Sequence, residues 1–82
     1  MADKDLELEC ERLEAAVDDF AFSMKKRLRK KLAEGLRGWD ELENKADIEE
    51  KMQSCEAELH RGDTARVVDV ANLAMFLYRL TQ

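Results

Sequence analysis

Two polar residues on the most apolar segment of the chain are the first candidates for chemistry. Asp69 and Asn72 lie within residues 67–80, where most of the other side chains are apolar. An acid buried without a partner is costly, so such a group is usually matched by a cation or by hydrogen-bond donors. Asp69 is therefore a candidate site residue, together with Asn72. A pair with Arg66, three residues earlier, or a position at an exposed helix edge would also explain Asp69.

A second acidic cluster precedes this segment. Asp47 and Glu50 are three residues apart, and Glu43 lies four residues before Asp47, so each pair projects from one helical face. Hard cations such as Mg²⁺ or Mn²⁺ bind clustered carboxylate oxygens while keeping several waters and contacting the phosphates of a substrate. Such spacing is also common on acidic helices that bind nothing.

Cations concentrate in one short stretch. Seven of the fourteen Lys and Arg residues fall within residues 25–37, where only Glu34 opposes them. This cluster could bind the phosphates of a nucleotide, or it could complement the dipole at the end of a helix. The net charge of −5 argues against binding to duplex DNA. The acidic surface also leaves open a role as a DNA mimic.

These residues sit on a pattern that predicts an all-α domain spanning residues 1–82. Apolar residues recur at alternating steps of four and three along the first segment, at Leu6, Cys10, Leu13, Val17, Phe20 and Met24. This spacing predicts a long helix over about 3–34 that packs lengthwise on other helices. Cys10 lies on its apolar stripe and is predicted to be a small core residue. Gly35 and Gly62 indicate helix ends, and Asp63 or Thr64 can cap the next helix. We therefore expect an antiparallel three-helix bundle, with further helices over about 41–60 and 64–80.

The third predicted helix is apolar on nearly every side, and 82 residues cannot cover it fully. We therefore expect a homodimer or larger oligomer with Val68, Met75 and Phe76 at the interface. No apolar run approaches the roughly 20 residues that cross a bilayer, so no membrane partner is expected. The two cysteines form no disulfide framework, which favours a cytoplasmic location. Neither a Gly-rich phosphate loop nor a Ser-His-Asp triad is visible.

Two motifs in the C-terminal half carry a family resemblance. The stretch Glu58-Leu-His-Arg-Gly-Asp63 is followed by Val68-Asp-Val-Ala-Asn-Leu-Ala-Met-Phe-Leu77. This resembles small phage-type proteins of the MazG-like, all-α nucleoside-triphosphate pyrophosphohydrolase superfamily. The dATP/dGTP diphosphohydrolase-like group of that superfamily shows a Gly-Asp turn and then Asp-Val-Ala-Asn-Phe-Ala-Met-Met. The resemblance covers residues 20–80 and extends upstream to Phe22, Met24, Arg27, Leu28, Lys31 and Gly38-Trp39.

The resemblance implies antiparallel helices packed into dimers or tetramers, with carboxylates from two helices holding Mg²⁺. The metal would activate water for attack on the triphosphate, releasing pyrophosphate and a nucleoside monophosphate. By residue matching, Asp69 and Glu50 would bind metal, with Asp47 as a substitute. Asn72, Arg27 and Lys31 would contact substrate.

Arg66 and Ser54 stand where the family pattern has carboxylates. Two interpretations therefore remain open, and no catalytic residue is assigned. The first is a Mg²⁺- or Mn²⁺-dependent pyrophosphohydrolase. The second is a catalytically inactive helical dimer that acts as an interaction or inhibitory protein, for example a phage-encoded factor that binds a host protein.

Overall fold

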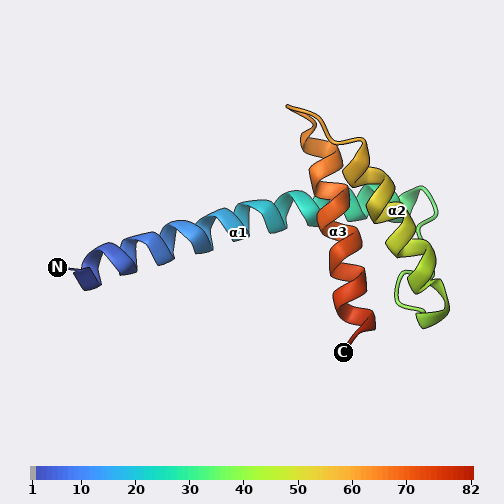
Figure 1. The fold of residues 1–82 in the computed structure, drawn as a ribbon, viewed down its shortest axis with the longest axis horizontal. Helices are drawn as coiled ribbons and strands as arrows, with labels where there is room; N and C mark the ends of the chain where they lie inside the picture. The colour runs from blue at the N-terminus through green and yellow to red at the C-terminus, as the bar shows by residue number, and fades with distance from the viewer. Residues whose placement is uncertain (1) are drawn as a thin grey trace.

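A computed structural model describes residues 2–82 as three α-helices, with no strand in that range (Figure 1). Helix α1 spans Ala2–Ala33, a single 3₁₀ turn η1 spans Leu42–Asn44, α2 spans Lys45–Ala57 and α3 spans Thr64–Leu80. The predicted all-α class is confirmed, and the bounds predicted for the first and third helices agree to within one residue. Residue 1, which the predicted domain includes, lies outside the described residues.

The helices form a pair crossed by a third. Helices α2 and α3 run side by side in opposite directions, and the C-terminal half of α1 passes across them (Figure 1). The N-terminal half of α1 extends away from the pair. Because α3 contacts both other helices, it is the element around which the described chain is organised.

Helix α1 ends in a hydrogen-bonded glycine turn. The N–H of Gly35 donates to the carbonyl of Leu32 at 3.1 Å, and the N–H of Leu36 donates to that of Lys31 at 2.9 Å. These two bonds require a left-handed residue at position 35, where Gly35 has φ +110°. The glycine predicted to end the first helix therefore does so.

A second glycine turn leads into α2. The side-chain amide of Asn44 donates to the carbonyl of Gly38 at 2.8 Å. Gly38 has φ +76°, and a Cβ there would lie only 2.7 Å from Nδ2 of Asn44. This turn directs the following residue, Trp39, back toward α3.

The prediction for the second helix was too long at both ends. Its first residues form the separate turn η1, and α2 stops at Ala57 rather than near His60. The chain tightens there, because the N–H of Leu59 bonds to the carbonyl of Glu56, three residues back. His60 therefore lies in the loop before α3, where its side chain is exposed. Asp63 caps α3 by accepting the N–H of Arg66 at 3.2 Å.

The core is small. Among the described side chains, only Ile48, Val68 and Phe76 form the buried apolar set. Phe76 packs against Trp39 with ring centroids 5.3 Å apart, which joins the loop after α1 to α3. Val68 and Phe76, which the sequence placed between copies, are thus buried within their own chain, while Met75 is half-buried.

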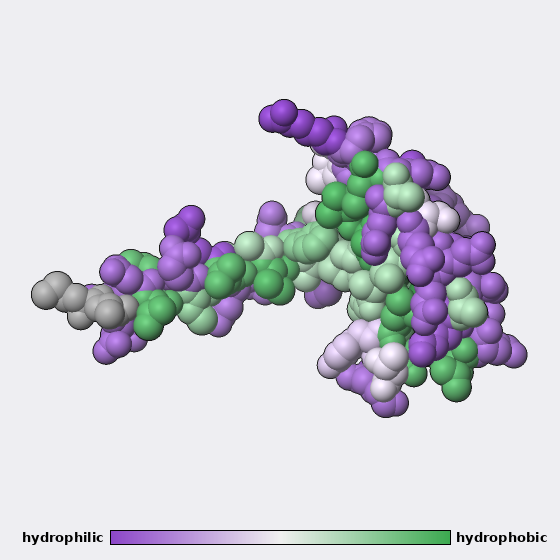
Figure 2. All heavy atoms as spheres, viewed as in Figure 1, coloured by the Kyte–Doolittle hydropathy of each residue, from purple (hydrophilic) through white to green (hydrophobic). Residues whose placement is uncertain are grey.

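The N-terminal half of α1 contributes nothing to this core. Every residue over 3–20 is exposed, including Cys10, so the expectation that Cys10 is a core residue was wrong. Leu6, Leu13 and Val17 are each about two-thirds exposed, at 68%, 66% and 65%. Figure 2 shows hydrophobic side chains along this projecting arm.

No helix among residues 2–82 is both long enough and apolar enough to cross a bilayer.

Replacing Phe76 by alanine should remove the central contact of this core. We expect Phe76→Ala to lower the free energy of unfolding by about 3–5 kcal/mol, measured by urea denaturation. Tyr78→Ala, two residues away and 63% exposed, is the matched control and should change it little. Equal losses in the two variants would contradict the described packing of α3.

Candidate functional site

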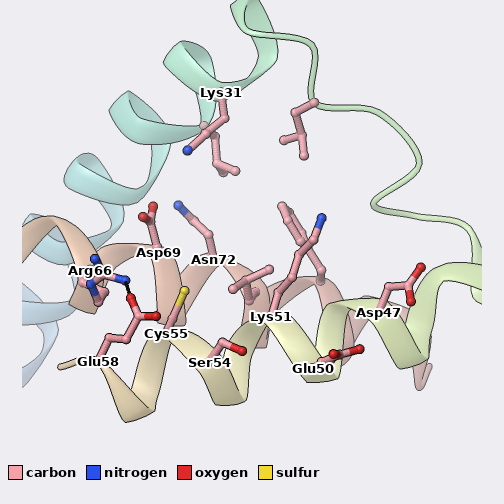
Figure 3. A pocket seen from close by; sticks show the side chains of 14 residues that line it. Lys31, Asp47, Glu50, Lys51, Ser54, Cys55, Glu58, Arg66, Asp69 and Asn72 are labelled. Atoms are coloured by element: carbon pink, nitrogen blue, oxygen red, sulfur yellow. Dashed lines mark hydrogen bonds and ion pairs between the residues drawn. The ribbon is translucent and has the colours of Figure 1, made fainter.

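A groove of about 590 Å³ opens between the C-terminal end of α1 and the α2–α3 pair (Figure 3). Five residues that the sequence marked as site candidates line it together, namely Lys31, Asp47, Glu50, Asp69 and Asn72. They come from all three helices. The structure therefore brings most of the predicted site residues to one place.

Arg27, the remaining substrate-contact candidate, occupies a different position. It lines a shallower hollow of about 300 Å³ with Lys26 and Lys30. Its guanidinium holds Asp69 through two hydrogen bonds, from Nε to Oδ1 at 2.8 Å and from Nη2 to Oδ2 at 3.1 Å. The hydrogen bond to Asp69 raises the pKa of Arg27 above its ordinary value. Asp69 thus has a cation partner, but it is Arg27 of α1 rather than the nearby Arg66.

Asn72 is the buried polar residue of the groove, with a residue exposure of 4%. Its amide Nδ2 donates to the carbonyl of Met24 at 3.3 Å, which ties α3 to α1. Its Oδ1 has no hydrogen-bond partner among the described residues. A buried acceptor left unpaired costs about 1–3 kcal/mol, which a ligand that donates to it would recover. In Figure 3, Asn72 and Asp69 point toward Lys31 across the groove.

Arg66 lines another end of the groove and is held by two carboxylates. Its Nε donates to Asp63 at 3.0 Å, and its Nη1 pairs with Glu58. These contacts, led by the hydrogen bond to Asp63, raise the pKa of Arg66. Desolvation raises the pKa of Asp63, but the backbone and side-chain hydrogen bonds from Arg66 outweigh it and hold that pKa below its usual range. Arg66 therefore stabilises the start of α3.

Two lysines of the groove carry cationic groups that are less constrained than those of Arg27 and Arg66. Lys31 makes only a long contact with Glu34, at 3.9 Å between Nζ and Oε2. Lys51 lies on α2, is exposed, and extends from that helix into the space below Lys31 (Figure 3). Mobile ammonium groups of this kind can follow the oxygens of a phosphate chain.

The acidic residues do not form a metal cage. Asp47 and Glu50 lie along α2, on the far side of Lys51 from Asp69 in Figure 3. Within residues 2–82, no three His, Cys, Asp or Glu side chains are close enough to hold a metal ion. The oxygen donors suit Mg²⁺ in type. Their arrangement fits only a cation held by one or two carboxylates together with the phosphates of a ligand.

Comparison with protein-family models, curated proteins and solved structures finds no match for this chain.

Three residues that line the groove were not predicted from the sequence to lie together with the other candidate site residues. Lys51, Glu58 and Arg66 line the same groove as the predicted residues. The sequence does contain a pattern that places Lys51 and Glu58 with the predicted residues, because positions 47, 51, 54 and 58 recur at helical spacing and therefore share one helix face. The pair between Arg27 and Asp69 spans 42 residues and leaves no such local signal.

The Arg27–Asp69 pair should be measurable as a coupling energy. We expect a double-mutant cycle of Arg27→Gln and Asp69→Asn to give about 1–2 kcal/mol from urea denaturation, because both side chains are only about a quarter exposed. Coupling near zero would contradict the pair. Arg12 and Glu9, a pair with both side chains mostly exposed, provide the matched cycle and should give less.

The capping carboxylate predicts a pH dependence. The pKa of Asp63 is lowered on folding, so its contribution to stability is present above the unfolded value of about 3.9 and is lost as the pH falls through the lower folded value. We expect urea midpoints to fall more steeply below about pH 4 in the parent than in Asp63→Asn, which keeps a capping oxygen but has no charge. Parallel pH profiles would show that Asp63 is not held as described.

Proposed function

We propose that this protein is a small MazG-like helical protein that binds a nucleoside triphosphate in its groove and releases pyrophosphate from it. In this proposal it acts as a homodimer or larger oligomer. The observation that carries the proposal is a groove lined by lysines and carboxylates whose wall contains Asn72, with its Oδ1 buried and unpaired. A ligand that offers an N–H or O–H group there, and anionic oxygens beside it, matches this combination.

A nucleotide has both kinds of group. Its base or ribose can donate to Oδ1 of Asn72, while Lys31 and Lys51 neutralise the phosphates. The volume of the groove, about 590 Å³, lies in the range of small-ligand sites. Discrimination would come mainly from Asn72, because a buried polar group rejects a ligand that leaves it unpaired.

Mg²⁺ or Mn²⁺ belongs to this proposal as an ion that is shared with the nucleotide. Glu50 and Asp47 could offer carboxylate oxygens to it, and Asp69 could do so only by giving up Arg27. When bound, the ion would supply a water activated for attack on the triphosphate. Lys31 and Lys51 would hold the phosphate chain in place along the groove.

A second function is favoured by one contact. Both carboxylate oxygens of Asp69 are occupied by Arg27, which gives Asp69 a structural role that needs no metal. A protein that keeps the helices but not the chemistry would serve as an interaction or inhibitory protein. Such a protein would still bind through its surface without turning over a nucleotide.

Nucleotide binding is the first test. We expect calorimetry with a panel of NTPs and dNTPs and Mg²⁺ to show binding by the parent. Lys31→Gln combined with Lys51→Gln should weaken it at least tenfold, because two charge-assisted contacts to phosphate are removed. Lys25→Gln, an exposed residue of α1 that does not line the groove, is the matched control. Equal binding by all the variants would place the nucleotide elsewhere.

Turnover separates the two functions. Pyrophosphate release is measured with the same panel and with Mg²⁺ or Mn²⁺, beside an Asp69→Ala variant whose helix content is checked by circular dichroism. We expect metal-dependent release that the folded variant loses. Binding without release would favour the interaction protein, and neither binding nor release from a folded protein would reject the nucleotide proposal.

A further inference from the structure

The chain exposes more surface than a compact folded monomer of its mass does. Its accessible area is 6728 Å², whereas a folded monomer of 9.5 kDa exposes about 5,000 Å². Its radius of gyration, 15.5 Å, likewise exceeds the roughly 12 Å expected for 82 residues. The excess of about 1,700 Å² is larger than one side of a standard protein interface, which is about 800 Å².

The projecting half of α1 contributes to this excess, because every residue over 3–20 is exposed. The apolar seam of α1 consists of Leu6, Cys10, Leu13, Val17, Phe20 and Met24. Its residues up to Phe20 are exposed, and Met24 is half-buried where α3 crosses. One continuous seam is therefore covered by the chain's own α3 at one end and bare at the other.

The spacing of the seam fits an antiparallel copy of itself. If two α1 helices align so that residue numbers facing each other add up to 30, Leu6 faces Met24, Cys10 faces Phe20, and Leu13 faces Val17. The layer of Cys10 with Phe20 and the layer of Leu13 with Val17 each join one position that follows a step of three with one that follows a step of four, as knobs-into-holes packing requires. The four inner seam residues face one another where both helices are exposed, and Leu6 meets the half-buried Met24 beside α3.

The charges of α1 favour the same direction. Its first 24 residues hold eight acids against Lys4 and Arg12, and residues 25–33 hold six bases and no acid. A parallel pair would align the two acidic halves over their whole length. The antiparallel pair brings Asp5 level with the partner's Lys25 and Arg12 level with the partner's Asp18. Two like-charged pairs remain at the same level, Glu11 with the partner's Asp19 and Lys4 with the partner's Lys26.

We propose that α1 pairs in antiparallel fashion with α1 of a second copy of this chain, through the exposed part of the seam, from Leu6 to Phe20. The second copy is the occupant because the seam is complementary to itself in both spacing and charge. The interface predicted from sequence at Val68 and Phe76 thus moves to α1, since those two residues are already buried in their own chain. This pairing does not depend on whether the groove binds a nucleotide.

A cysteine experiment reports the direction of pairing. In a Cys55→Ser background, Phe20→Cys would place a thiol opposite the partner's Cys10. Within one helix these two positions are about 15 Å apart, too far for a disulfide. We expect mild oxidation to convert most of the Phe20→Cys protein to a covalent dimer on a non-reducing gel. Phe22→Cys, two residues away and off the seam, is the matched control and should remain mostly uncrosslinked.

The Cys55→Ser variant without an added cysteine tests for a parallel pair. A parallel pair would bring Cys10 beside the partner's Cys10, so efficient crosslinking of Cys55→Ser alone would overturn the proposal. Equal crosslinking of Phe20→Cys and Phe22→Cys would also overturn it, since only random collision treats the two positions alike.

Sedimentation equilibrium tests the seam without added cysteines. The parent should be a dimer, and Leu13→Asp should weaken dimerisation at least tenfold because it places a charge in the central layer. Leu8→Asp is the matched control, because it makes the same substitution at an exposed leucine off the seam, and it should leave the dimer intact. A monomeric parent, or equal weakening by both substitutions, would overturn the proposal.

Discussion

The ion pair between Arg27 and Asp69 determines how α1 meets the rest of the chain. It joins residues 42 positions apart through two hydrogen bonds, and one turn along α3 the amide of Asn72 adds a third connection to the backbone of α1. Because only three apolar side chains are buried among the described residues, the packing alone specifies the crossing weakly. Directional polar contacts therefore fix the orientation of α1, and with it the width of the groove.

The same pair sets the chemistry available in the groove. A carboxylate that neutralises an arginine cannot also match the charge of a metal ion without leaving that arginine unpaired. Metal binding by Asp69 would therefore be at the expense of its pair with Arg27, whereas the Nδ2 of Asn72 serves the structure and its buried Oδ1 makes no hydrogen bond among the described residues.

Local signals in the sequence predicted the local structure well. Gly35 and Asp63 mark helix ends through their own backbone and capping preferences, so the bounds of α1 and α3 could be predicted. The gathering of Asp47, Glu50 and Asp69 along one groove also followed from residue type and resemblance, but their separation by Lys51 did not. Neither did the pairing of Asp69 with Arg27, because the sequence places only Arg66 within reach of Asp69, and the crossing of α1 over α3 brings Arg27 there instead.

The stacking of Trp39 on Phe76 has a consequence for observing this molecule. Trp39 is the only tryptophan in the chain, and the ring that it packs against also lines the groove. Its emission therefore originates from a single place, where the loop after α1, the core of α3 and the wall of the groove meet. The protein carries a built-in optical reporter that senses this junction, with almost no contribution from the distant projecting arm.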